Sequence, residues 1–386
     1  MNVKQCAFVA VLLVAAVCLV TLANAGCVDW LKGEAGQEAK LLNVVSKLKA
    51  TRVISIQDCD KINAIDQEGM RGVWGNSPVN EYDRNYAKRL KEYLGIDLII
   101  VRSKELLEEM GKVGDKEAKK LADLWINEAT EVKNVTRKDI IRAATLCLAF
   151  KALIKKYDAA AITYESATLT LSEQKVKAWT PLAILELSKE HIPCCCQSHV
   201  DCLVTQTIGT YITDGSVGFV GDVLNDWAFE PTAARPEKVV VIGHCGAPIT
   251  PHGDDRIPYL IRDHIHSNKK WFGPEDIPTA TTVQWPTGQA ASIIKFDVYR
   301  WKVSVFTGTV LDGNSLYKDF ANCICRNKIV IRIDNPEHCY MLPSDSKEGA
   351  FRNWWGSWGC HQVVFYGDHK QKITDFAALT GFEVVE

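Results

Sequence analysis

The sequence predicts an α/β protein with a parallel-sheet body of one or two Rossmann-like layers, followed by a β-rich C-terminal region. In the body, short runs of β-branched residues alternate with longer segments whose apolar residues recur at helical spacing. After about residue 250, strand-like segments dominate. The 386 residues suffice for about two or three domains. We expect an N-terminal α/β domain at 26–160, a central α/β domain at 161–250 and a β-rich domain with a terminal helix at 251–386.

The first 25 residues differ from the rest of the chain. Cys6–Leu22 is almost entirely apolar, and Ala23–Ala25 has small residues at the spacing of a signal-peptidase site. We therefore expect a signal peptide and an exported, extracytoplasmic protein. The alternatives are an uncleaved membrane anchor, because the apolar run nearly reaches the length of a bilayer span, and a cytoplasmic protein if the start is misassigned.

In the first α/β region, the residues at element ends support the predicted boundaries. Thr136 and Ser103 are suitable N-caps, and Gly95 ends a helical segment. The predicted helices are 26–51, Glu81–Leu94, Ser103–Glu109, Lys119–Val132 and Thr136–Tyr157. The predicted strands are Arg52–Ile56, Ile96–Val101 and Ala159–Tyr164.

From residue 165 the alternation continues. Helices are predicted at Trp179–Lys189 and His199–Ile212, with a cysteine-rich turn at 193–198 between them and a short strand at Val217–Gly221. The run Val239–Ile242 is followed by Gly-His-Cys-Gly, which predicts a buried strand that ends in a tight turn at His244. Open α/β sheets bind ligands at such strand ends.

The last third of the chain favours strands. The segment Ile257–Ser267 has a helix-like pattern, most simply a solvated helix face. The predicted strands are Thr281–Gln284, Ala291–Tyr299, Lys302–Leu311, Lys328–Ile333 and His361–Tyr366, and the predicted helix is Lys372–Thr380.

Composition excludes several classes of function. The formal net charge of −2 gives no electrostatic footprint for nucleic acid or an anionic membrane. No glycine-rich phosphate-binding motif follows a predicted strand, so nucleotide cofactors are not implied.

The fourteen cysteines have no regular spacing, and either disulfides or buried free thiols explain them. A Cys/His nucleophile at His244 and Cys245 is disfavoured, because neighbouring residues of a strand point to opposite faces.

A set of histidines and carboxylates lies at strand ends and helix starts, where elements converge. Two imidazoles and one or two carboxylates are suitable ligands for a divalent ion such as Mn²⁺. The alternative is structural, with Asp201 capping a helix and Asp222 making a turn. The set consists of His199, Asp201, Asp222, His244 and His361.

Four motifs, in order, resemble the L-fucose/L-arabinose isomerase C-terminal superfamily, in particular its shorter fucose isomerase-like proteins. They are the stretch Cys196–Asp222, VVVIGHCGAP at Val239–Pro248, Cys325-Arg326 before a strand, and GCHQVVFYGDH at Gly359–His369. The resemblance extends from about Ile141 to the end of the chain. It implies a metal-dependent aldose–ketose isomerase that acts on a small sugar through an enediol, with Mn²⁺ or else Zn²⁺, in a homo-oligomer.

The resemblance also implies roles for individual residues. His361 would be a metal ligand, Asp201 a ligand or the acid/base, and His244 a ligand or a contact to a sugar oxygen. His199 could serve as a ligand in place of a carboxylate. Glu165, which ends the Ala159–Tyr164 strand, is the nearest further carboxylate for a second proton-transfer role. Asp222 would lie in the sugar pocket. Trp358 and His252 are further candidates for sugar contacts, although core packing and a solvated surface explain them as well.

Two positions depart from the family pattern. His199 stands where the family commonly has Glu, and Cys360 stands where the last motif often has Asn or His. These changes leave two alternatives to an isomerase. One is a non-catalytic carbohydrate-binding or structural descendant of the fold, and the other is a metal-dependent hydrolase or lyase on a sugar derivative.

Overall fold

The computed structural model describes residues 34–66, 69–71, 79–166, 169–170, 173, 175–224, 228–265, 277–342 and 358–385. The expected signal peptide or anchor at 1–25 lies outside the described residues. Among the helices of the described ranges, none combines the length and the hydropathy needed to cross a membrane.

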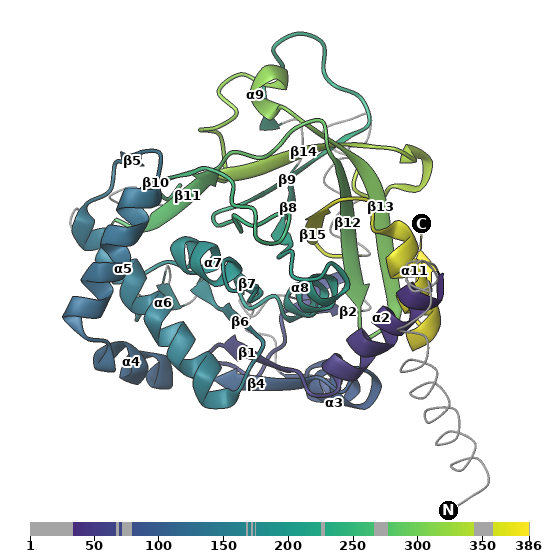
Figure 1. Cartoon of the computed structure of the whole chain (residues 1–386), viewed down its shortest axis with the longest axis horizontal. Helices are drawn as coiled ribbons and strands as arrows, with labels where there is room; N and C mark the ends of the chain where they lie inside the picture. Colours follow the sequence, from purple (N-terminus) through teal and green to yellow (C-terminus); the bar gives the residue numbers. More distant parts are fainter. Residues whose placement is uncertain are drawn as a thin grey trace, which may run out of the picture.

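A four-stranded parallel sheet forms the α/β body, as the alternating pattern predicts (Figure 1). Its strand order is β4 (Asp97–Val101), β1 (Arg52–Ile56), β6 (Ala161–Tyr164) and β7 (Cys194–Cys196). The sequence predicts a turn at 193–198, but the three consecutive cysteines form the edge strand β7. Three residues are too few for a pattern to distinguish a strand from a turn.

The helices of the body lie within the predicted segments or differ from them by up to four residues, and the start of the first predicted helix, 26–33, lies outside the described residues. They are α2 (Glu34–Leu48), α3 (Glu81–Leu94), α4 (Ser103–Lys112), α5 (Asp115–Glu128), α6 (Arg137–Tyr157), α7 (Pro181–Ser188) and α8 (Val200–Ile212). Thr136 caps α6 in a capping box with Asp139, as expected. Ser103 does not cap α4. Instead, Asp58 accepts hydrogen bonds from the backbone N–H and the hydroxyl of Ser103.

Six antiparallel strands form a closed ring above the body in Figure 1. The order is β12 (Ala290–Asp297), β15 (His361–Tyr366), β8 (Phe219–Leu224), β9 (Val239–His244), β14 (Asn327–Ile333) and β13 (Lys302–Leu311), and β13 pairs again with β12. The short strand β16 (Glu383–Val385) adds to β13 in parallel. The ring therefore combines strands from both sides of residue 250, where the sequence places a domain boundary.

Smaller elements complete the described fold. β10 (Tyr259–Asp263) lies between β11 (Thr279–Val283) and β5 (Val132–Lys133), so the segment that reads as a helix from its sequence begins as a strand. The others are the hairpin of β2 (Ala64–Asp66) and β3 (Gly69–Arg71), the short helices α9 (Gly313–Leu316) and η4 (Pro336–His338), and α11 (Lys370–Thr380).

Helix α8 joins the two sheets. Its side chains are buried all around the helix except near its C-terminal end, and it contacts β1 and β6 of the body and β12 and β15 of the ring. A helix packed between two sheets is expected to be buried on every face. Gly209 allows the close approach, because a Cβ atom there would lie 2.2 Å from Cζ of Phe365.

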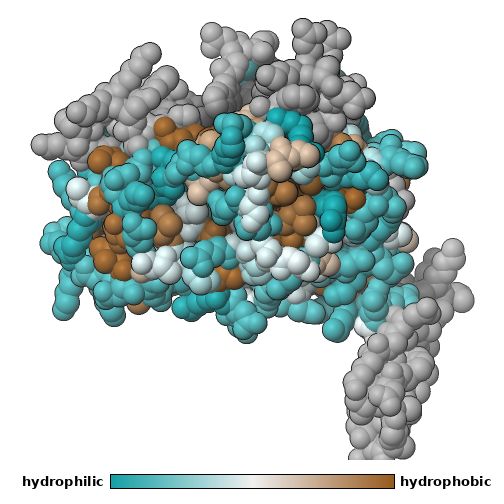
Figure 2. Space-filling model, turned by 90° about the horizontal axis from the view of Figure 1, so that it is seen from above, coloured by the Kyte–Doolittle hydropathy of each residue, from teal (hydrophilic) through white to brown (hydrophobic). Residues whose placement is uncertain are grey.

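The surface is ordinary for a globular protein. On the face shown in Figure 2, hydrophobic residues reach the surface in separate patches between hydrophilic ones. Large exposed apolar side chains, such as Leu42, Tyr93 and Leu124, lie on different helices. Scattered residues of this kind need no functional explanation.

Candidate metal centre

A strained turn carries His199 to the junction of the body and the ring. After β7, Gln197 and Ser198 have φ angles of +65° and +50°, a conformation that costs free energy in residues other than glycine. The Ser198 hydroxyl donates to the carbonyl of Ile56 at 3.1 Å, and Asn63 Nδ2 donates to the carbonyl of Gln197 at 2.7 Å. His199, the N-cap residue of α8, then lies with its ring centroid 3.7 Å from that of His361.

The strand register brings three of the expected residues to one end of the ring. His361, the first residue of β15, pairs with Asp222 in β8, and Asp222 pairs with Gly243, next to His244 in β9. Directly opposed residues of antiparallel strands have neighbouring side chains. The sequence predicts that β8 ends before Asp222, whereas β8 continues to Leu224, and this extension places Asp222 beside His361.

Two groups of metal-ligating side chains meet at this junction. The imidazole–carboxylate group contains Asp222, Cys360 and His361, and the ring of His199 lies against that of His361 at an interplanar angle of 36°. Nε2 of His361 lies 3.3 Å from Asp222 Oδ1, and Nδ1 lies 3.1 Å from Cys360 Sγ. The thiol group contains Cys196, His244 and Cys245. The imidazole–carboxylate group and the thiol group lie next to each other, with the ring centroids of His244 and His361 5.3 Å apart.

His244 and Cys245 are in contact, contrary to the alternation argument from the sequence. Cys245 Sγ lies 3.3 Å from His244 Nδ1. Strand β9 ends at His244, so Cys245 already belongs to the following turn and the alternation of strand side chains no longer applies to it. Burial opposes ionisation of Cys245, but hydrogen bonding from Cys196 and the nearby His244 keep the pKa of its thiol well below the usual value.

Asp201 is held by a buried ion pair. Its Oδ2 lies 2.5 Å from Nζ of Lys295, which also contacts Cys202 Sγ at 2.8 Å and the carbonyl of His361 at 2.9 Å. The sequence predicts Asp201 as a metal ligand or proton-transfer group. The ion pair with Lys295 engages this carboxylate. The structure therefore suits Asp201 to positioning the start of α8 and of β15.

The buried imidazoles favour the neutral form that binds metal ions. Burial lowers the pKa of His199 and of His361 well below the usual value, and the nearby positive charge of Lys295 adds to this effect. Burial raises the pKa of Asp222. His244 differs, because Cys245 and Asp222 overcome the effect of burial and raise its pKa.

These shifts predict how acid affects the metal-free protein. Below about pH 6.5 the unfolded chain protonates His199 while the folded chain does not, so stability falls as the pH falls. The H199Q variant removes one such proton. We measure the free energy of unfolding of both proteins by urea titration after chelation, at pH 6 and at pH 5. We expect the value for H199Q to fall less steeply than that for wild type, by up to about 1.4 kcal/mol per pH unit. Equal slopes would contradict the buried neutral imidazole.

Glu165 lies one strand away from the turn that carries His199. It follows β6, and its backbone N–H donates at 2.9 Å to the carbonyl of Ile56, the same oxygen that accepts from the Ser198 hydroxyl. The side chain is buried. Glu165 is therefore near the junction, at the carboxyl edge of the parallel sheet, where α/β proteins bind ligands.

The two candidates for sugar contacts do not reach an open site. Trp358 is buried, stacks on Tyr340 at 5.8 Å and has the guanidinium of Arg300 5.4 Å from its ring centroid. His252 is exposed and packs against Tyr366. Tyr366 ends β15 and His361 begins it, which places His252 roughly 16 Å along the strand from the junction.

Sequence reasoning missed five residues of the site. Trp179 donates its indole N–H to Cys245 Sγ at 3.3 Å, and the ring of His264 lies 4.4 Å from that of Trp179. One signal was available, because Cys245 directly follows the expected residue His244, whereas nothing local indicates Lys295. The missed residues are Trp179, Cys196, Cys245, His264 and Lys295.

The donor set fits a divalent ion. His361, Asp222 and Cys360 have ligand atoms within 4.8 Å of one another. An imidazole and a carboxylate can bind Zn²⁺ or Mn²⁺, and the thiols close by shift the preference towards Zn²⁺. Nε2 of His361 is buried and makes no hydrogen bond within the part of the chain that the structure describes, although Asp222 faces it. A buried unsatisfied nitrogen of this kind is a sign of an ion or water ligand.

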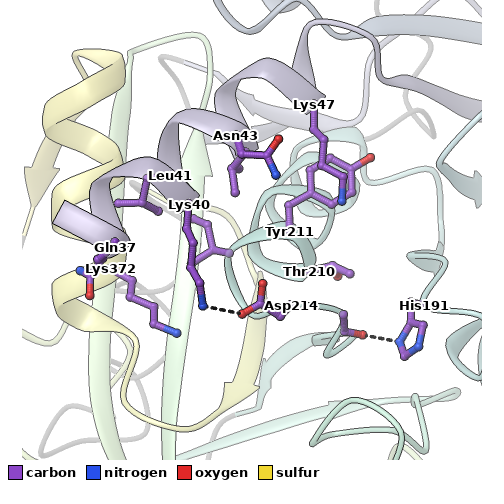
Figure 3. Close-up of a pocket in the computed structure, with 14 residues that line it drawn as sticks. Gln37, Lys40, Leu41, Asn43, Lys47, His191, Thr210, Tyr211, Asp214 and Lys372 are labelled. Carbon is purple, nitrogen blue, oxygen red and sulfur yellow. Dashed lines mark hydrogen bonds and ion pairs between the residues drawn. The ribbon is translucent and has the colours of Figure 1, made fainter. Parts of the chain in front are cut away.

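A pocket of about 680 Å³ lies away from the junction of the body and the ring. It is lined by α2, the end of α8 and Lys372 (Figure 3). There Lys40 pairs with Asp214 at 3.8 Å, and Lys47 lies over the ring of Tyr211. None of the residues expected at the active site lines it. His199 is the N-cap residue of α8 and this pocket lies at the other end of the helix, roughly 18 Å away.

Comparisons with known proteins do not assign the chain to a family. No model of a known protein family matches the chain, and no curated protein has a significantly similar sequence. The resemblance to the fucose isomerase-like proteins therefore stays a prediction from the four motifs.

Proposed function

We propose that the chain binds a divalent ion, Mn²⁺ or Zn²⁺, through His361, Asp222 and His199, and that it interconverts a small aldose and its ketose. The observation that carries the proposal is the buried Nε2 of His361, which faces Asp222 Oδ1 at 3.3 Å without a hydrogen bond. Two ligands of one divalent ion lie about 3–3.5 Å apart, so the two atoms have the spacing of a ligand pair.

The chemistry divides between the ion and the chain. When bound, the ion would stabilise the charge that develops on the two sugar oxygens as the enediol forms. We assign to Glu165 the transfer of the proton between C1 and C2, because it is the buried carboxylate beside the His199 turn and Asp201 is paired with Lys295. Lys295 and Asp201 hold His361 and α8 in place.

A second candidate function is a closed metal site that stabilises the fold without catalysis. The side chains of His199, His244 and His361 are all buried. Structural metal sites are closed in this way, whereas catalytic sites keep an open position.

Isomerisation in D₂O distinguishes the two candidates. The full chain is loaded with Mn²⁺ or Zn²⁺, incubated with aldopentoses and 6-deoxyaldohexoses, and followed by NMR. We expect a ketose with deuterium at C1, formed by wild type and by the exposed-histidine variant H338A, but not by E165Q or D222A. Bound metal without ketose would favour the structural candidate. Cleavage products would indicate a hydrolase or lyase, and failure to bind either metal would overturn the proposal.

A further inference from the structure

We propose that Cys196, His244 and Cys245 form a second metal site, for a thiolate-preferring divalent cation of the Zn²⁺ class. The site is separate from the ion proposed at His361 and Asp222, and it does not depend on that proposal. It would hold the body and the ring together, since Cys196 ends β7 and His244 ends β9.

The three donor atoms have nearly the spacing of a tetrahedral ligand set. The two sulfurs are 3.6 Å apart, and His244 Nδ1 lies 3.1 Å from Cys196 Sγ and 3.3 Å from Cys245 Sγ. In a zinc site, bonds of about 2.3 Å to sulfur and about 2.0–2.1 Å to nitrogen place two sulfurs about 3.8 Å apart and sulfur and nitrogen about 3.5 Å apart. Shifts of a few tenths of an ångström complete this geometry.

Charge and burial favour an ion here. All three side chains are buried, with exposed fractions of 2%, 4% and 6% for Cys196, His244 and Cys245. Two thiolates would carry a charge of −2 in an interior that does not solvate it, and a divalent cation neutralises this charge. Soft thiolate donors with an imidazole select Zn²⁺ over the oxygen-preferring Mg²⁺, Ca²⁺ and Mn²⁺.

The surroundings supply the remaining parts of a metal site. The indole N–H of Trp179 donates to Cys245 Sγ at 3.3 Å, the kind of outer contact that fixes a metal-bound thiolate. The cavity of about 10 Å³ beside Cys196 and His244 has room for one water as the fourth ligand.

A disulfide between Cys196 and Cys245 is the competing chemistry. It would need a sulfur–sulfur distance of about 2.0 Å, whereas the sulfurs are 3.6 Å apart. It would also leave His244 without the role that its contact with both sulfurs gives it. We therefore favour metal binding, and the experiment below treats the disulfide as an outcome against the proposal.

Cobalt titration of the full chain tests the site. Reduced, metal-free protein is titrated with Co²⁺, whose bond to thiolate gives a sulfur-to-metal charge-transfer band in the near ultraviolet. We expect this band to saturate at one equivalent and to disappear on adding Zn²⁺. We expect the C196S/C245S variant to lose the band and one equivalent of bound metal. H361A should keep the band, and so should C147S, which changes a buried cysteine of α6.

The wild-type result does not depend on the folding of a variant. No charge-transfer band in folded wild type would overturn the proposal, and so would a Cys196–Cys245 disulfide in protein alkylated during isolation. Loss of the band in H361A but not in C196S/C245S would also overturn it. If H361A loses no metal while the band is present, the isomerase proposal fails and the thiol site remains.

Discussion

Replacing His361 with alanine is expected to remove one equivalent of bound divalent metal and to lower aldose–ketose conversion about a thousandfold. Stabilisation of enediol charge by a bound ion contributes several kcal/mol, and about 4 kcal/mol corresponds to this factor. His361 is the residue that combines a buried, unsatisfied nitrogen with a carboxylate at ligand distance. Elemental analysis of the purified protein and initial rates with the best sugar measure the two effects.

The control for this prediction is the H338A variant, because His338 is exposed in η4, the short helix that follows β14. It should keep wild-type metal content and rate. The D222N variant keeps the size of the side chain but removes its charge, so we expect weaker metal binding with the fold intact. An H361A protein that retains both its metal and its rate would refute the assignment of this ion.

The second large effect is expected at Lys295, where methionine should destabilise the protein by about 3–5 kcal/mol. The side chain is fully buried, and its ammonium contacts the Asp201 carboxylate and the His361 carbonyl. Methionine fills a similar volume but leaves the Asp201 charge buried and unpaired. Urea denaturation monitored by circular dichroism, fitted with a common slope, gives the change in free energy of unfolding.

Two further variants test whether loss of the buried ion pair causes the destabilisation expected for K295M. K302M removes an exposed ion pair with Glu383 in the same ring and should cost about 1 kcal/mol or less. The double variant K295M/D201L removes both buried charges and should recover most of the loss, because an apolar pair of similar volume replaces the ion pair. If K295M and K302M have equal stabilities, the buried pair does not hold the junction together.

Much of the fold could be predicted from local patterns. Capping residues and helical periodicity define α3 and α6, and the predicted bounds of Lys302–Leu311 and His361–Tyr366 are those of β13 and β15. The α/β body and the strand-rich C-terminal part both follow from such patterns. The pairing partners of the strands do not follow from local patterns. A β-branched run has the same pattern in a parallel and in an antiparallel sheet, so β9 could not be assigned to the ring from its sequence.

The same limit applies to the site. His199, Asp222, His244 and His361 could be selected because each lies near a strand end or a helix start. Their division into two groups depends on the register of β15, β8 and β9, which no single segment encodes. The pairing of Asp201 with Lys295 joins distant segments, and therefore only the folded chain shows that this carboxylate has a partner.

The closed ring of six strands has a consequence for synthesis of the chain. Strands β8 and β9 leave the ribosome long before β15, which fills the place between β8 and β12. Until then, β8 exposes an edge with unpaired backbone groups, and such edges promote aggregation. A nascent or truncated chain that ends near residue 250 therefore exposes this edge, and the proposed metal ligands from β8, β9 and β15 come together only when translation is almost complete.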